Sequence, residues 1–232
     1  KYDVSLDATL PITKGIDEII ETLFIALALV ILVVFLFIQD WRATLIPTLA
    51  IPVSLLGAFM AFPLLGFTIN TLSLLGLVLA IGIVVDDAIV VVEAVQVNMA
   101  TGMNAKEATN LAMKQVTAPV IATTLVLVAV FVPVAMMGGI TGSLYQQFAI
   151  TIAVSVLFSS MNALTLSPAL CGLLLKPPKP YRGPLGWFFS IFNRVFDRST
   201  KTYMGFAHVF ARKIFMGLVF IIALAVGTGM LG

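Results

Sequence analysis

The sequence predicts an all-α polytopic membrane protein, built as a bundle of six transmembrane helices. Apolar residues make up 60% of the 232 residues and charged residues only 10%, whereas a soluble domain carries about 25% charged residues. Six apolar stretches are long enough to cross a hydrocarbon core about 30 Å thick, which takes about 20 helical residues. Strand-like alternation of polar and apolar residues is absent, which argues against a membrane β-barrel.

The six predicted spans follow a short polar leader. Lys1–Lys14 is interpreted as the end of a soluble region, and a start at Lys1 indicates a piece of a longer chain. Asp17, Glu18 and Glu21 cluster where the first helix is expected to begin, because the positive end of the helix dipole favours acids. The spans are Glu18–Ile38, Ala43–Pro63, Asn70–Val95, Val116–Gly138, Leu144–Leu175 and Ile214–Gly232, the last of which is expected to be truncated.

The distribution of basic residues predicts the orientation. Eleven of the thirteen Lys and Arg residues fall in the connections Gln39–Arg42, Gln96–Gln115 and Lys176–Lys213. The connections Leu64–Ile69 and Gly139–Ser143 hold none. Because cytoplasmic connections carry the excess of basic residues, the N-terminus is predicted to lie outside the cytoplasm and the long connection inside.

The long connection, 176–213, contains a predicted amphipathic helix. Its basic and polar side lies opposite an aromatic side, which is typical of a helix in the membrane–water interface. Packing against the protein's own cytoplasmic loops is the alternative, and nearby anionic lipid favours the interface. The apolar side consists of Trp187, Phe188, Ile191, Phe192, Val195 and Phe196.

The candidate functional residues are two adjacent acids inside the third span. Asp86 and Asp87 lie past its middle, where one aspartate costs about 2.5–3.5 kcal/mol on insertion scales. Glu93 lies closer to the inner end and is interpreted as interfacial. Two adjacent carboxylates in a low dielectric cannot both be ionised without a nearby cation, and the six spans contain no Lys or Arg. The pair is therefore predicted to be a proton relay, with Gly76 and Gly82 allowing neighbouring helices to pack closely.

The pair and the composition allow other interpretations. An intramembrane aspartyl protease needs two carboxylates that face each other, whereas consecutive residues point about 100° apart on one helix. A sterol-sensing or scaffolding domain would not require titratable acids, and a buried polar pair could simply hold helices together. A net charge of +2 without a basic tract gives no indication of a nucleic-acid partner. The single cysteine, Cys171, is interpreted as a buried small hydrophobe, and no cofactor or metal is expected.

At the third span the sequence resembles a known family. The run Gly82–Glu93 is similar to the central helix of the resistance-nodulation-cell division (RND) efflux pumps, and its double aspartate resembles their hydrophobe/amphiphile branch. The likeness extends along nearly the whole chain. It includes Trp41–Pro47, Phe67–Leu72, Lys106–Ala108, Phe131–Pro133 and Thr165–Cys171.

The resemblance implies a proton-driven antiporter of the bacterial inner membrane that exports hydrophobic or amphiphilic compounds. It implies that Asp86 and Asp87 bind and release the protons, with a Lys, an Arg and a Thr supplied by a second half. The chain would then comprise a periplasmic porter end (1–15), five transmembrane helices (16–175), a cytoplasmic connection (176–213) and a sixth span (214–232). A homotrimer, a periplasmic adaptor protein and an outer-membrane channel are the implied partners besides the lipid bilayer.

Overall fold

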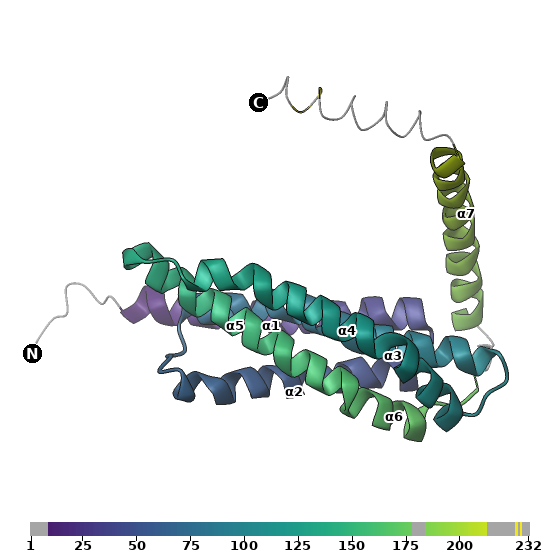
Figure 1. Ribbon diagram of the computed structural model, residues 1–232, viewed down its shortest axis with the longest axis horizontal. Coiled ribbons are helices and arrows are strands. Elements are labelled where there is room, and N and C mark those ends of the chain that lie inside the picture. The colour runs from purple at the N-terminus through teal and green to yellow at the C-terminus, as the bar shows by residue number, and fades with distance from the viewer. Residues whose placement is uncertain (1–8, 178–183, 213–225, 227, 229–232) are drawn as a thin grey trace, which may run out of the picture. The chain divides into compact units, whose positions relative to one another are not determined.

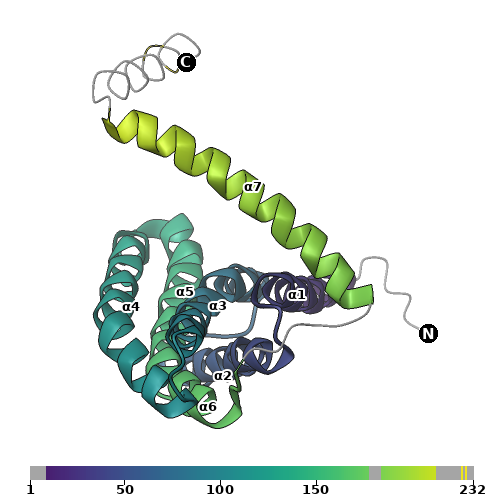
Figure 2. The ribbon, with the colours of Figure 1, turned by 90° about the vertical axis from the view of Figure 1, so that its right-hand side faces the viewer.

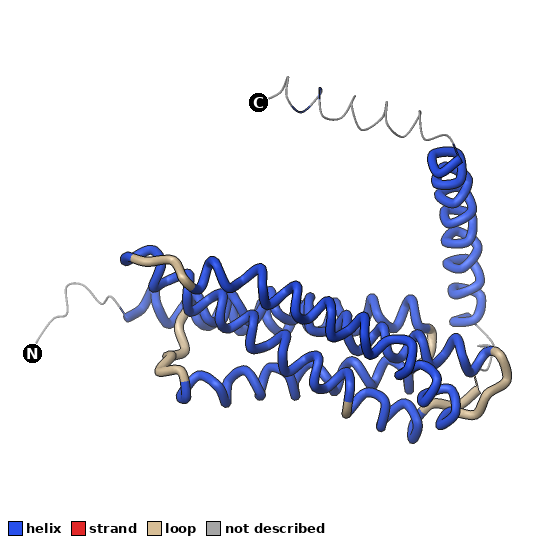
Figure 3. The backbone as a smooth tube through the Cα atoms, in the orientation of Figure 1, coloured by secondary structure: helices blue, strands red, loops and turns tan. Residues whose placement is uncertain are grey.

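The computed structural model describes residues 9–177, 184–212, 226 and 228, and within these residues it contains helices and turns but no strand (Figure 3). The chain divides into two compact units, Lys1–Pro178 and Lys179–Gly232, which are described separately. The helices are α1 (Thr9–Ile38), α2 (Trp41–Leu64), α3 (Thr71–Ala100), α4 (Ala105–Ala135), α5 (Gly139–Leu164), α6 (Leu166–Leu174) and α7 (Pro184–Arg212) (Figure 1).

Five stretches of the first unit are long and apolar enough to cross a membrane, which confirms the predicted helical membrane bundle. The predicted sixth span, Ile214–Gly232, lies outside the described residues except for Val226 and Thr228. The same applies to the first eight residues of the leader. The five stretches are Lys14–Ile38, Trp41–Leu64, Thr71–Ala100, Ala105–Ala135 and Tyr145–Leu174.

Helix α1 begins at Thr9, well before the predicted start of the first span at Glu18. Pro11 does not prevent this, because backbone N–H groups in the first turn have no helical partner to lose. Asp17, Glu18 and Glu21 consequently lie about two to three turns into the helix, and its first turn contains no acid. The prediction that these acids lie at the start of the helix is therefore wrong.

Helix α3 is the central element of the first unit. It contacts α1, α2, α4, α5 and α6, and Figure 2 shows α3 among these helices in the end-on view. On one side its residues Ile81 and Val85 form a buried cluster with Ile51 of α2, against which Leu27 of α1 packs. Since α3 carries the candidate acids, these contacts fix the position of the helix from which Asp86 and Asp87 project.

The two glycines of α3 differ in their surroundings. A Cβ atom added at Gly76 would lie 3.3 Å from both the ring and the carbonyl oxygen of Phe148 on α5. The predicted close helix approach is therefore present at Gly76. At Gly82 a Cβ atom would meet nothing within 4 Å, so the prediction of close packing is wrong there among the described residues.

The predicted fifth span, Leu144–Leu175, is two helices instead of one. Helix α5 ends at Leu164, and Thr165 has φ −121° and ψ −65° between it and α6. Pro168 explains the break, because proline has no N–H to donate to the carbonyl of Leu164 and its ring clashes with the preceding turn. Pro168 therefore interrupts the α5–α6 span near one end.

Hydrogen bonds between distant residues join the helices at both ends of the bundle. At one end, Nη1 of Arg42 donates to the carbonyl of Leu174, the last residue of α6, at 3.5 Å. At the other end, Gln147 of α5 accepts from Nδ2 of Asn70 and donates to the carbonyl of Thr68, both at 2.6 Å. Asn70 is the N-cap of α3, so this contact holds the start of α3 against α5.

In the second unit, α7 is a single helix of 29 residues that extends the predicted amphipathic segment at both ends. Trp187 and Tyr203 are each 70% exposed, and Phe188, Val195 and Phe196 are exposed as well. Helix α7 thus carries both exposed large apolar side chains and the basic residues Arg194 and Arg198. This combination agrees with the predicted amphipathic character.

Candidate functional site

The candidate site lies on the middle of α3. Apolar residues flank the site on both sides along the helix. The backbone here forms its hydrogen bonds within the helix, as a backbone in hydrocarbon must. Asp86 and Asp87 are consecutive, so their side chains leave the helix about 100° apart. Asp86 is exposed, whereas Asp87 is half-buried. The two carboxyl groups therefore have different environments although they are neighbours in sequence.

Asp87 is hydrogen-bonded to a neighbouring helix. The Oγ atom of Ser159 on α5 donates to Oδ2 of Asp87 at 2.8 Å. The same Oγ atom also lies 2.8 Å from the carbonyl oxygen of Val84, one turn earlier on α3. Ser159 is only 3% exposed, so this polar contact is enclosed between α3 and α5.

A second polar contact continues the site toward α2. Asn162, one turn beyond Ser159 on α5, donates from Nδ2 to Oγ of Ser54 at 2.8 Å. Ser54 is completely buried in α2. Ser159 thus bonds to Asp87 on α3, and Asn162, one turn later on the same helix, bonds to α2.

Asp86 belongs to a face of α3 that no described residue covers. Exposed residues recur on this face at spacings of three and four, which is one side of an α-helix. Gly82, one turn before Asp86, adds to the openness because it has no side chain. The face consists of Leu75, Leu79, Gly82, Asp86, Val90, Glu93 and Val97.

The sequence analysis identified the acids but missed Ser159 and Asn162. Thr151, Ser155 and Ser159 recur at intervals of four on α5, and all three are buried. Hydroxyl groups that repeat on one face of an apolar helix indicate a face turned toward protein rather than lipid. That spacing could have identified α5 as the partner of Asp87.

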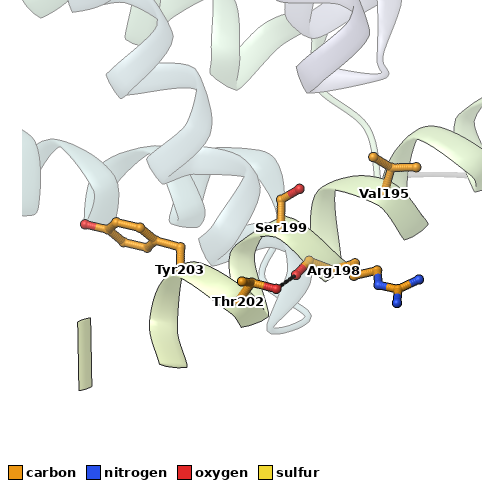
Figure 4. Close-up of a pocket in the computed structure, with 5 residues that line it drawn as sticks. All are labelled: Val195, Arg198, Ser199, Thr202 and Tyr203. Carbon is orange, nitrogen blue, oxygen red and sulfur yellow. Dashed lines mark hydrogen bonds between the residues drawn. The ribbon is translucent and has the colours of Figure 1, made fainter. Parts of the chain in front are cut away.

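The rest of the described structure offers no competing site. Among the described residues no group of three or more His, Cys, Asp or Glu could hold a metal ion, and Cys171 is buried as predicted. A hollow on α7 is lined by residues without an acid, His or Cys, and its one drawn hydrogen bond joins Thr202 to the carbonyl of Arg198 (Figure 4). Its lining consists of Val195, Arg198, Ser199, Thr202 and Tyr203.

Comparison with known proteins gives one consistent result. A family model described as the AcrB/AcrD/AcrF family matches residues 1–231. The multidrug export protein AcrF of Escherichia coli (strain K12) is 48% identical over 199 residues, 85% of this chain and 19% of the relative. The solvent-resistant pump membrane transporter SrpB of Pseudomonas putida is 43% identical over 203 residues, with the same coverage of both chains. The chain thus spans about a fifth of the length of these curated relatives.

Proposed function

Because the chain belongs to the AcrB/AcrD/AcrF family, we propose that it is the part of an efflux transporter in which Asp86 and Asp87 bind and release the protons that drive export. Membership confirms the predicted resemblance to RND pumps, and the relatives are transporters and not enzymes. Together with the five membrane-capable helices, it also confirms the predicted location in the bacterial inner membrane.

The hydrogen bond between Ser159 and Asp87 is the observation that carries the proposal. A carboxylate in the middle of a membrane helix is expensive, and a donor from the neighbouring helix α5 reduces this cost while leaving the carboxyl group able to titrate. Asp86, directly beside it, is exposed on the open face of α3. Asp87 therefore contacts the bundle, and Asp86 can contact the part of the complete transporter that packs on the open face of α3.

The charges of the two carboxyl groups are coupled, so the pair can release or bind a proton when the charge nearby changes. Adjacent carboxyl groups in a low dielectric share at most one negative charge unless a cation compensates the second. The described helices have no Lys or Arg between Arg42 and Lys106 or after Lys114 up to Leu174. A cation brought to the open face of α3 would release a proton from the pair, and its departure would take one up. Moving one such charge across the membrane is worth about 2.3 kcal/mol per 100 mV.

The remaining parts of the proposal concern the complete transporter. The open face of α3 is proposed to meet the second half of the protein, which supplies the cation, and the substrates are hydrophobic or amphiphilic compounds. Relatives of this chain are described as multidrug and solvent pumps. Assembly as a homotrimer with a periplasmic adaptor protein and an outer-membrane channel completes the proposed antiporter. The proposed orientation places residues 1–15 in the periplasm and residues 176–213 in the cytoplasm.

Proton-driven transport by single-site variants tests the proposal. The complete transporter is reconstituted in liposomes, and export of a fluorescent amphiphile is measured with and without an imposed proton gradient. Asp86→Asn and Asp87→Asn are each expected to lower gradient-driven export to the level without a gradient, because the neutral amide cannot exchange a proton. Glu93→Gln, which alters an acid on the same face two turns away, is the matched control and keeps its response to the gradient.

Insertion must be unchanged for this test to be informative, so the amount of each variant in the membrane is measured in parallel. An Asp87→Asn transporter that still accelerates export when the gradient is applied would contradict the proposal.

A further inference from the structure

Ser159 stands between two acceptors on α3. Its Oγ atom is 2.8 Å from Oδ2 of Asp87 and 2.8 Å from the carbonyl oxygen of Val84. A serine hydroxyl carries a single hydrogen but two acceptor lone pairs. It can therefore donate fully to only one of these oxygens at a time, and it can accept a hydrogen from the other side.

We propose that Ser159 is a positioning residue that changes its hydrogen-bond partner when Asp87 gains or loses a proton, and thereby links the proton site to the contact between α3 and α5. The inference rests on the proposed function, because it requires that Asp87 exchanges protons. It adds a residue on a second helix that responds to the exchange.

The direction of the change follows from the donors and acceptors in each state. Ionised Asp87 can only accept, and a hydrogen bond to a charged oxygen is roughly twice as strong as one between neutral groups. Ser159 therefore donates to Oδ2 of Asp87 in this state. When a proton binds to Oδ2, the carboxyl group becomes a donor to Oγ of Ser159. The serine hydrogen then turns to the carbonyl of Val84, and no covalent bond other than the O–H bond on Asp87 is formed.

The other hydroxyls on this face of α5 do not make such contacts. Thr151 donates to the carbonyl of Gln147 at 2.7 Å, and Ser155 donates to the carbonyl of Thr151 at 2.8 Å. Both bonds stay within α5. Ser159 instead reaches across to α3 with both of its contacts, so only there does the hydroxyl join two helices.

Few other charges can influence this contact. Asp86 is the ionisable neighbour of Asp87 in the sequence, and α5 and α6 contain no Asp, Glu, Lys or Arg. On α3 itself Glu93 follows two turns later. The charged residues of the other helices packed against α3 all lie in the N-terminal halves of those helices. They are Lys14, Asp17, Glu18 and Glu21 on α1, Arg42 on α2, and Lys106, Glu107 and Lys114 on α4.

Infrared difference titration of the complete transporter tests the inference. With ¹³C-labelled aspartate, the protonated Asp87 carboxyl band is identified by its loss in Asp87→Asn, and its intensity is followed against pH. In Ser159→Ala the half-protonation pH is expected to rise by about half to one pH unit, because the ionised form loses the stronger hydrogen bond. The frequency of the band should also shift, since its hydrogen-bond partner is gone.

Two further variants separate this role from packing. Ser155→Ala removes an equally buried hydroxyl one turn away whose bond stays within α5, and it should leave the band and its titration unchanged. Ser159→Thr keeps the hydroxyl group and should titrate close to the unmodified protein.

The outcomes distinguish the inference from the proposed function. A Ser159→Ala titration identical to that of the unmodified protein overturns the role of Ser159 but leaves proton exchange at Asp87 intact. If Ser155→Ala shifts the titration as much as Ser159→Ala, the effect is one of packing and the inference also fails. If no Asp87 band changes with pH in the unmodified protein, the proposed function itself is wrong.

Discussion

The ring of Phe158 on α5 packs against the backbone of α2 at Gly57. A Cβ atom added at Gly57 would lie 2.5 Å from Cδ1 of this ring and 2.6 Å from its Cγ. Cβ atoms do not approach other carbon atoms this closely, so only glycine fits while Phe158 keeps its position. Phe158 immediately precedes Ser159, and the contact therefore also fixes the part of α5 that bonds to Asp87.

Gly57→Ala is expected to destabilise the bundle by about 1–3 kcal/mol, the usual cost of overpacking a filled interior. Its free energy of unfolding can be measured in detergent micelles. Gly57→Ala combined with Phe158→Leu should recover part of the loss, because the smaller side chain makes room for the methyl group. Gly205→Ala on α7, where nothing lies within 4 Å, is the control and should not be destabilised by overpacking.

The hydrogen bond between Asn162 and Ser54 is expected to contribute a measurable coupling between α5 and α2. Interhelical hydrogen bonds in membrane proteins contribute about 0.6 kcal/mol on average in double-mutant cycles. Asn162→Ala, Ser54→Ala and the double variant form such a cycle, with unfolding free energy as the measurement. Purely additive losses would contradict a direct contribution of this bond.

Asn98 is expected to be intolerant of a carboxylate. The residue is 7% exposed, and its side-chain amide donates to the carbonyl of Ala108 and to Oε1 of Gln115, both at 3.3 Å, across the turn between α3 and α4. Asn98→Asp replaces this donor with an acceptor that faces the Ala108 carbonyl, so it should cost more stability than Asn98→Ala, which is expected to cost about 1–3 kcal/mol.

The cost of Asn98→Asp should depend on pH. The neutral carboxyl group regains a hydrogen that it can donate, so the folded state of the variant favours the protonated acid. The stability difference from the unmodified protein is then largest at high pH and shrinks as the pH falls. A pH-independent difference would show that the lost hydrogen bond is not its cause.

Helix α7 is expected to lie in the membrane–water interface. In the complete transporter with Trp41→Phe, and with any other tryptophans also replaced, brominated anionic lipid should quench the fluorescence of Trp187. Charge reversal by Arg194→Glu and Arg198→Glu should weaken quenching, because basic residues near an anionic surface contribute about 1 kcal/mol each. Quenching as weak as that of a fully solvated tryptophan would favour the alternative of packing on cytoplasmic loops.

The existence of the bundle could be predicted from the sequence because membrane spanning depends on length and hydrophobicity, which are local properties. Its details depend on single residues. The break at Thr165 was foreseeable from Pro168, which cannot continue the hydrogen-bond pattern of α5, but the apolar length of the segment concealed it. The early start of α1 at Thr9 could not be foreseen from hydropathy, because its first residues are helical without being part of an apolar stretch.

The acids of the candidate site on α3 were predicted, but their partner on α5 was not. Asp86 and Asp87 are conspicuous because acids are costly in a membrane helix. Ser159 is one hydroxyl among many and is 72 residues away from Asp87 in sequence. Which hydroxyl reaches the acid depends on how α3 and α5 cross, and the sequence contains no direct information on that crossing. For the same reason Gly82 was expected to be covered and is open.

The hydrogen bond from Arg42 to the carbonyl of Leu174 joins residues that are 132 positions apart in sequence. Its donor leaves the ribosome with the second helix, whereas its acceptor emerges only when the sixth has been synthesised. This contact therefore forms after all the intervening segments have been inserted. A pair of probes at these two positions would report when the first six helices have come together during biosynthesis, a step that helix content alone does not distinguish.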